Sequence, residues 1–167
     1  MPGKPKIMTV YGTRPEAIKV APVVSALQND DRFDSVVVST GQHREMLEQV
    51  NKRFGITPDY DMALMKPGQT LNELVSRAIK GLDPIIDEEM PDVIISQGDT
   101  STAMVAALAG FHKGVKIVHL EAGLRTGNIF SPFPEEANRK IIGQIASLHL
   151  APTNESVSYT HLRAHET

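Results

Sequence analysis

The chain has 167 residues and no cysteine, which excludes disulfide bonds, thiolate metal sites and cysteine nucleophiles. It also lacks any run of 18 apolar residues, so no segment is predicted to span a membrane. Its first residues contain too short an apolar stretch for a signal peptide. Together these absences predict a cytoplasmic protein.

A surplus of positive charge is missing as well. The chain has 17 lysines and arginines against 20 aspartates and glutamates, and its formal net charge is -3. We therefore expect no nucleic-acid partner. Apolar residues make up 41% of the chain, which is ordinary for a globular protein, and the length suits one domain with a sizeable core.

What the sequence does contain is a regular alternation of apolar runs and amphipathic stretches. Strands are expected at residues 6–11, 36–39, 59–65, 93–96, 115–119 and 148–151. Helices are expected at residues 15–29, 44–54, 70–89, 101–111 and 135–146. Thr70 and Glu73 form a capping box, and Pro84 is expected to kink or divide the helix that follows. This alternation predicts an α/β fold with a doubly wound, Rossmann-like parallel sheet.

The last twelve residues differ from the rest. Residues 156–167 read SVSYTHLRAHET, which is polar and shows no clear apolar face. We expect this tail to be disordered or not native to the domain. His161 and His165 stand four residues apart, as metal ligands on a helix would. No third ligand lies nearby in the sequence, so we predict no metal site.

Charged residues gather most densely at residues 119–139, which read HLEAGLRTGNIFSPFPEEANR and directly follow an apolar run. The glycines and prolines of this segment break regular structure, so it is expected to be a loop until the next helix begins. Loops at the carboxyl ends of strands are where open α/β sheets bind ligands. The segment is therefore the first candidate for a functional site.

Three carboxylates, Asp99, Glu121 and Glu135, are expected to converge at this edge of the sheet. Carboxylates that lie close together repel, so one of them is expected to stay protonated at neutral pH, which would provide a general acid and a general base. Simpler interpretations stay open. Asp99 would suit an N-cap, although Thr100 can cap the same helix. Glu135 and Glu136 would complement a helix dipole.

A second candidate is the turn GTRPE at residues 12–16, which follows the first strand. Backbone N–H groups at the start of a helix, with the side chains of Arg14 and Lys19, would suit a phosphate or diphosphate. The turn matches neither the P-loop nor the dinucleotide fingerprint, and solvated basic residues would explain it equally well. Arg125 and Arg139 would suit salt bridges to the glutamates. His112, His119 and His149 are expected to be structural.

Five segments, GTRPEAIKVAPV, TGQHREML, QGDTSTAM, HLEAGLRTGN and SPFPEEANRKI, together resemble the N-terminal half of non-hydrolysing UDP-N-acetylglucosamine 2-epimerases. The resemblance runs from residue 6 to about residue 155. It implies that residues 1–155 form the N-terminal Rossmann-like domain of a two-domain, glycosyltransferase-B-type architecture. Because the C-terminal UDP-binding domain is absent from this sequence, we expect the chain to be inactive alone.

The family interconverts UDP-N-acetylglucosamine and UDP-N-acetylmannosamine. UDP is eliminated as the C2 proton is lost, and UDP then adds back to 2-acetamidoglucal while a proton returns to the other face of C2. No metal or other cofactor takes part. The resemblance implies that Asp99, Glu121 and Glu135 are the acid/base carboxylates. It also implies that Arg14, Lys19 and Arg139 hold or shape the substrate site.

In some family members, Gln42 and His43 belong to a regulatory substrate site. Here residues 66–69 read KPGQ, without the arginine of some relatives. The resemblance further implies a homodimer of the full-length enzyme, with UDP-N-acetylglucosamine as its ligand. Two alternatives stay open: a hydrolysing relative that releases N-acetylmannosamine and UDP, and a non-catalytic nucleotide-sugar-binding domain.

Overall fold

The computed structural model describes residues 3–41 and 44–161, and within these ranges six parallel strands form one sheet. The strands are β1 (Lys6–Tyr11), β2 (Asp34–Ser39), β3 (Tyr60–Asp61), β4 (Val93–Gln97), β5 (Lys116–Leu120) and β6 (Leu148–Leu150), in the spatial order β3-β2-β1-β4-β5-β6. The helices are α1 (Arg14–Gln28), α2 (Arg44–Phe54), α3 (Leu71–Glu89), α4 (Ser101–His112), α5 (Glu135–Ile145) and α6 (Asn154–His161). The predicted Rossmann-like α/β fold is confirmed.

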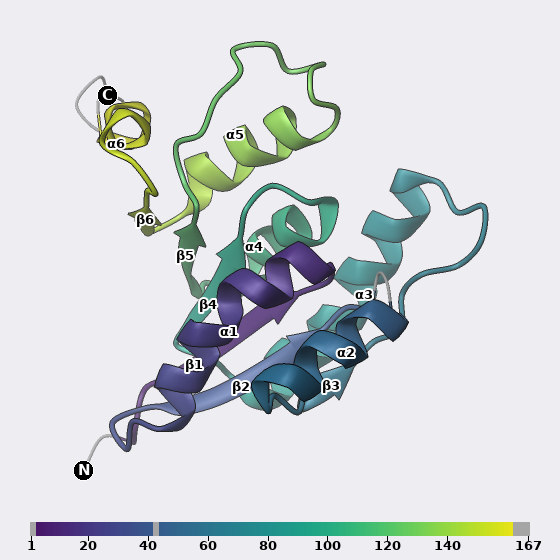
Figure 1. Cartoon of the computed structure of the whole chain (residues 1–167), viewed down its shortest axis with the longest axis vertical. Helices are drawn as coiled ribbons and strands as arrows, with labels where there is room; N and C mark the ends of the chain where they lie inside the picture. The colour runs from purple at the N-terminus through teal and green to yellow at the C-terminus, as the bar shows by residue number, and fades with distance from the viewer. Residues whose placement is uncertain (1–2, 42–43, 162–167) are drawn as a thin grey trace.

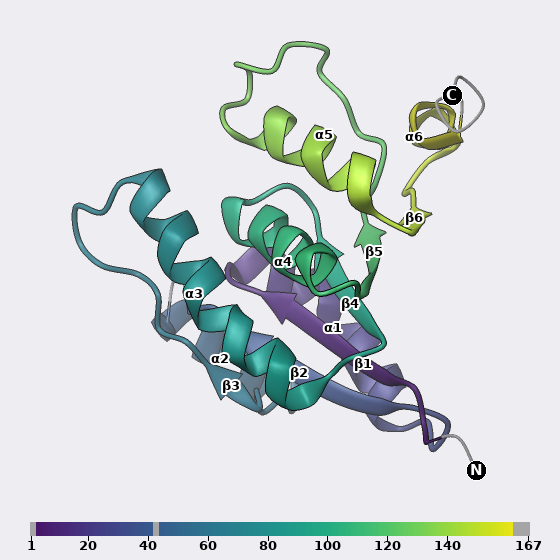
Figure 2. The ribbon, with the colours of Figure 1, turned by 180° about the vertical axis from the view of Figure 1, so that it is seen from behind.

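Helices cover both faces of the sheet. Helices α1 and α2 lie in front of it in Figure 1, and α3 and α4 lie in front of it when the molecule is seen from behind in Figure 2. Neighbouring residues of one strand enter different layers: Val10 packs with α3 and α4, whereas Tyr11 packs with α1 and α2. Burial on both faces explains why the central strands are continuous apolar runs.

The predicted helices and strands are present, with bounds that differ by a few residues. The capping box at the start of α3 is confirmed, since the backbone N–H of Glu73 donates to the side chain of Thr70 and the backbone N–H of Thr70 donates to the side chain of Glu73. Helix α3 runs through Pro84 without interruption, so the proline does not divide it. The third strand is shorter than predicted, because only two residues of 59–65 pair with β2.

The tail departs from the expectation of disorder as far as the structure describes it. Thr153 directly precedes helix α6, and its hydroxyl accepts the backbone N–H of Ser156 at 3.1 Å. The buried Ser156 packs on Gly123, where a Cβ would come within 2.0 Å of the Ser156 carbonyl oxygen. A polar cap and this close backbone contact therefore hold the helix without a broad apolar face. The side chain of His161 and all of His165 lie outside the described residues, and the tail's origin stays a prediction.

The strand order reverses between β1 and β4, and ligands of such sheets bind at this point, beyond the carboxyl ends of the strands. The loop after β1 is closely approached here by the loop after β2 and by the first turn of α4. A Cβ on Gly12 would lie 2.1 Å from Oγ1 of Thr40 and 2.8 Å from Oγ1 of Thr102, so only glycine fits between these hydroxyls. Among the described residues, no helix is long and apolar enough to cross a membrane.

Candidate active site at the carboxyl edge of the sheet

Arg139 of α5 joins the carboxyl ends of β4 and β5. Its side chain is only 4% exposed, and its guanidinium forms an ion pair with Asp99 and lies 3.6 Å from Oε1 of Glu121. The same guanidinium donates a hydrogen bond to the backbone carbonyl of Glu121. Two of the three predicted carboxylates are therefore brought together, with a buried positive charge between them.

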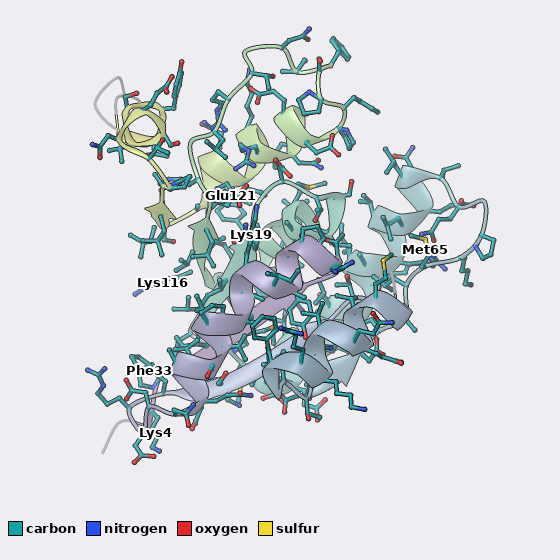
Figure 3. The ribbon with its side chains drawn as sticks, viewed as in Figure 1. Lys4, Lys19, Phe33, Met65, Lys116 and Glu121 are labelled. Atoms are coloured by element: carbon teal, nitrogen blue, oxygen red, sulfur yellow. The ribbon has the colours of Figure 1, made fainter. Side chains whose placement is uncertain are left out.

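Lys19 approaches the same group from α1. Its ammonium forms an ion pair with Oε2 of Glu121, and these two side chains meet in Figure 3. The amide of Gln97 donates to the same carboxylate oxygen at 2.8 Å. Glu121 has a φ of 62°, a left-handed conformation that is strained for a residue with a side chain. The contacts with Lys19, Gln97 and Arg139 hold this conformation.

The pKa of Glu121 shows that the cations outweigh burial. Burial alone would raise this pKa, but the hydrogen bond and charge of Lys19, the charge of Arg139 and the hydrogen bond from Gln97 together place it below its ordinary value. Glu121 is therefore expected to be ionised at neutral pH. Glu121 is therefore not the carboxylate that repulsion would keep protonated, because Arg139 stands between it and Asp99, and the prediction that one member of the group stays protonated remains a prediction.

Asp99 does not cap α4. Thr100 is the N-cap, and its hydroxyl accepts the backbone N–H of Ala103 at 3.0 Å. The Asp99 side chain pairs with Arg139 instead, while its backbone carbonyl accepts a hydrogen bond from the buried amide of Asn138 at 2.9 Å. The simpler interpretation of Asp99 as a cap is therefore wrong. The sequence did not predict the contribution of Asn138.

Glu135 and Arg14 stand apart from this group. Glu135 is partly buried at the start of α5, and Arg14 is exposed at the start of α1. Neither side chain makes a hydrogen bond or an ion pair with the other residues that the structure describes, so the roles of Arg14 and Glu135 stay predictions. The neighbouring Glu136 is the buried one of the pair, and it accepts the backbone N–H of Thr126 at 3.1 Å.

Glu16 is a further buried carboxylate that we did not select from the sequence. It accepts the backbone N–H groups of Gly12 at 2.8 Å and of Thr13 at 2.7 Å, and the hydroxyl of Thr100 at 2.5 Å. Burial raises the pKa of Glu16, and these hydrogen bonds oppose the rise. The T-x-x-E pattern at residues 13–16 repeats the one at residues 70–73 and would have indicated the local cap.

Gln42 and His43 lie outside the described residues, so the structure says nothing of the regulatory site. In the part of the chain that it does describe, no three histidine, aspartate or glutamate side chains are grouped to hold a metal ion. His119, in contrast, has the structural role we expected. It is buried, and its Nε2 lies 2.7 Å from the carbonyl of Gly98, just before Asp99.

The pKa of His119 is lowered from 6.5 to about 4, chiefly by burial and also by the charge of Arg139, although the hydrogen bond to Gly98 opposes the shift. Between these pH values the unfolded chain binds a proton that the folded chain does not. The free energy of unfolding is therefore expected to rise with pH, and the contribution of His119 is complete above pH 6.5.

His119→Gln removes this titration and keeps an amide that can reach Gly98. Urea unfolding of both proteins near pH 5 and near pH 7.5 provides the measurement. On going from pH 7.5 to pH 5, we expect the free energy of unfolding of the original chain to fall by about 2 kcal/mol more than that of the variant. The same pH dependence in both proteins would show that His119 titrates normally in the fold.

We next compared this chain with known proteins. A family model described as UDP-N-acetylglucosamine 2-epimerase matches residues 25–163, a range that extends past residue 155 into the tail. The UDP-N-acetylglucosamine 2-epimerase of Yersinia pestis is 55% identical over 151 residues, which cover 90% of this chain and 40% of that protein.

Solved structures agree with the sequence match. The UDP-GlcNAc 2-epimerase of Neisseria meningitidis, bound to UDP-GlcNAc, has a TM-score of 0.92 at 45% identity, covering 95% of this chain and 43% of its own. The enzyme of Methanocaldococcus jannaschii, in complex with UDP-GlcNAc and UDP, has a TM-score of 0.89 at 29% identity, covering 96% and 44%. This chain thus spans about two fifths of the length of these relatives. It belongs to the UDP-N-acetylglucosamine 2-epimerase family.

Proposed function

We propose that this chain supplies one wall of an active site that interconverts UDP-N-acetylglucosamine and UDP-N-acetylmannosamine. The observation that carries the proposal is the ion-paired group of Lys19, Glu121, Arg139 and Asp99 beside the reversal point of the sheet, in a chain of the epimerase family. The relative from Neisseria meningitidis, of which this chain matches 43%, was solved with UDP-GlcNAc bound.

Glu121 and Lys19 suit the first step of such a reaction. Loss of the weakly acidic C2 proton needs a base, and departure of UDP needs positive charge near the diphosphate. The side chain of Lys19 is 51% exposed, so its ammonium can turn from Glu121 to a diphosphate oxygen. Glu121 would then lose a cationic partner, its pKa would rise, and it would become a more effective base when substrate is bound.

Asp99 and Glu135 complete the proposed acid/base set, because a proton must also be delivered to C2 from the other face. Arg14, at the start of α1, is proposed to bind the diphosphate through its side chain, because the backbone N–H groups of Gly12 and Thr13 in the same turn already donate to Glu16. Arg139 shapes the site by holding Asp99 and Glu121 in place. We further propose that a second domain of the complete protein forms the opposite wall of the site, and that the complete enzyme is a cytoplasmic homodimer.

The test is a chimaera in which residues 1–155 of this chain precede the matching C-terminal part of the Yersinia pestis relative. Incubation with UDP-N-acetylglucosamine in D₂O is expected to produce UDP-N-acetylmannosamine that carries deuterium at C2, which NMR detects directly. The 167-residue chain alone is the control and is expected to give negligible product.

The products separate the alternatives. Free N-acetylmannosamine and UDP as the main products would contradict the proposal in favour of a hydrolysing enzyme. Calorimetric binding of UDP-N-acetylglucosamine without any turnover would instead indicate a nucleotide-sugar-binding domain. Robust turnover by the 167-residue chain would overturn the proposal that a second domain is required.

A further inference from the structure

The chain contains two capping boxes whose local geometry is nearly the same. In α1 the backbone N–H of Thr13 donates to Glu16 at 2.7 Å, and in α3 the backbone N–H of Thr70 donates to Glu73 at 2.7 Å. The return bonds, from the backbone N–H of each glutamate to the threonine hydroxyl, measure 3.4 Å and 3.2 Å. As helix caps the two boxes are equivalent.

Their surroundings differ completely. Glu73 is exposed, whereas Glu16 is only 4% exposed. A helix cap contributes about 1 kcal/mol wherever it stands, and burying a carboxylate costs free energy unless hydrogen bonds replace the lost water. The exposed box shows that capping does not require burial. The burial of Glu16 therefore indicates a role beyond the end of its own helix.

The additional hydrogen bonds of Glu16 show what it connects. Its Oε2 accepts the backbone N–H of Gly12, and its Oε1 accepts the hydroxyl of Thr100, which lies 84 residues further along the chain. Thr100 directly follows Asp99 and caps α4. One carboxylate thus joins the loop after β1 to the loop after β4, across the point where the strand order reverses.

The opposite side of the Asp99 loop is held by α5. Asn138 donates to the backbone carbonyl of Asp99, and Arg139 pairs with its carboxylate. The loop is therefore fixed between α5 on one side and Glu16 on the other. Loss of either attachment would let Asp99 shift, and a shift of about 1 Å in a catalytic group can cost about 100-fold in rate.

We propose that Glu16 is a positioning residue that holds the Asp99 loop against the turn at residues 12–14. The expected effect of Glu16 on turnover rests on the proposed function. The link that Glu16 makes between the two loops is independent of that function, and it can be measured on the 167-residue chain itself.

The first experiment measures amide hydrogen exchange by NMR on the 167-residue chain. Glu16→Gln is expected to speed exchange by roughly ten-fold both at residues 12–17 and at residues 98–104, since a neutral amide holds three donors less well than a carboxylate. Glu73→Gln is the matched control, because it removes the same charge from the same kind of cap. Its effect is expected to stay within residues 70–75.

Thr100→Ala tests the link from the other loop and serves if Glu16→Gln does not fold. It should speed exchange at Gly12 and Thr13, whereas Thr100→Ser, which keeps the hydroxyl, should restore the original rates. If the effects of Glu16→Gln and Thr100→Ala each remain confined to the helix that carries the substitution, Glu16 is only a local cap and the inference is wrong.

The second experiment measures steady-state kinetics in the chimaera. Glu16→Gln is expected to lower kcat about ten-fold and to leave KM within about two-fold, because it displaces an acid/base group without removing a substrate contact. Glu73→Gln should leave both constants unchanged. An unchanged kcat in Glu16→Gln would overturn the positioning role. A chimaera without any epimerase activity would contradict the proposed function, and the exchange rates would still decide whether Glu16 joins the two loops.

Discussion

Glu121→Gln is expected to lower kcat of the chimaera by roughly 100- to 10,000-fold, which is the usual contribution of a general acid or base. The amide keeps the size of the side chain and can still accept hydrogen bonds from Lys19 and Gln97, but it cannot take a proton from C2. The loss should therefore appear in kcat, with a much smaller effect on KM. Deuterium exchange at C2 of UDP-N-acetylglucosamine, followed by NMR, should fall in parallel.

A control variant separates this loss from a general effect of removing a carboxylate. Asp87 is an exposed carboxylate of α3 that pairs with Lys113, and α3 covers the face of the sheet opposite to α1. Asp87→Asn should therefore leave kcat unchanged. Circular dichroism and urea unfolding confirm that each variant is folded. A rate near that of the unsubstituted chimaera in Glu121→Gln would remove Glu121 from the mechanism.

The sequence predicted the sheet well because its central strands are buried on both faces. Such strands appear as short apolar runs, and residues 6–11 and 93–96 could be recognised without any tertiary information. Helix α6 was missed because the same kind of apolar pattern is absent from its sequence. It has little apolar periodicity, and it is held by the Thr153 hydroxyl and by the backbone contact between Ser156 and Gly123, neither of which is visible in a hydrophobic pattern.

The candidate site was predicted only in part. The rule that parallel strands bring their carboxyl ends together correctly placed Asp99 near Glu121. It could not predict the charge state of Glu121, because that depends on where Lys19 and Arg139 reach from helices far away in the sequence. The two T-x-x-E patterns make the same point: residues 13–16 and 70–73 are alike in sequence, and only the fold buries one of them.

Among the substitutions considered, Arg139→Met is expected to lower the free energy of unfolding the most. Methionine fills similar apolar space but leaves Asp99 and Glu121, whose side chains are only 30% and 21% exposed, facing each other without a cation between them. It also removes the donor to the backbone carbonyl of Glu121. Removing one partner of a buried ion pair costs 3–5 kcal/mol, and because these carboxylates keep some contact with water we expect about 2–4 kcal/mol.

The pH dependence of this loss tests its electrostatic cause. The pKa of Glu121 is lowered in the fold, so its ionised form contributes stability above its ordinary pKa, and this contribution is lost as the pH falls. The difference between the original chain and Arg139→Met in urea unfolding should therefore be greatest near neutral pH and smaller near pH 4. Arg32→Met is the control, because Arg32 pairs with Asp30 on the surface with a side chain that is 79% exposed, and it should change stability little at either pH. A loss that is the same at both pH values would show that Arg139 stabilises the fold by packing rather than by charge.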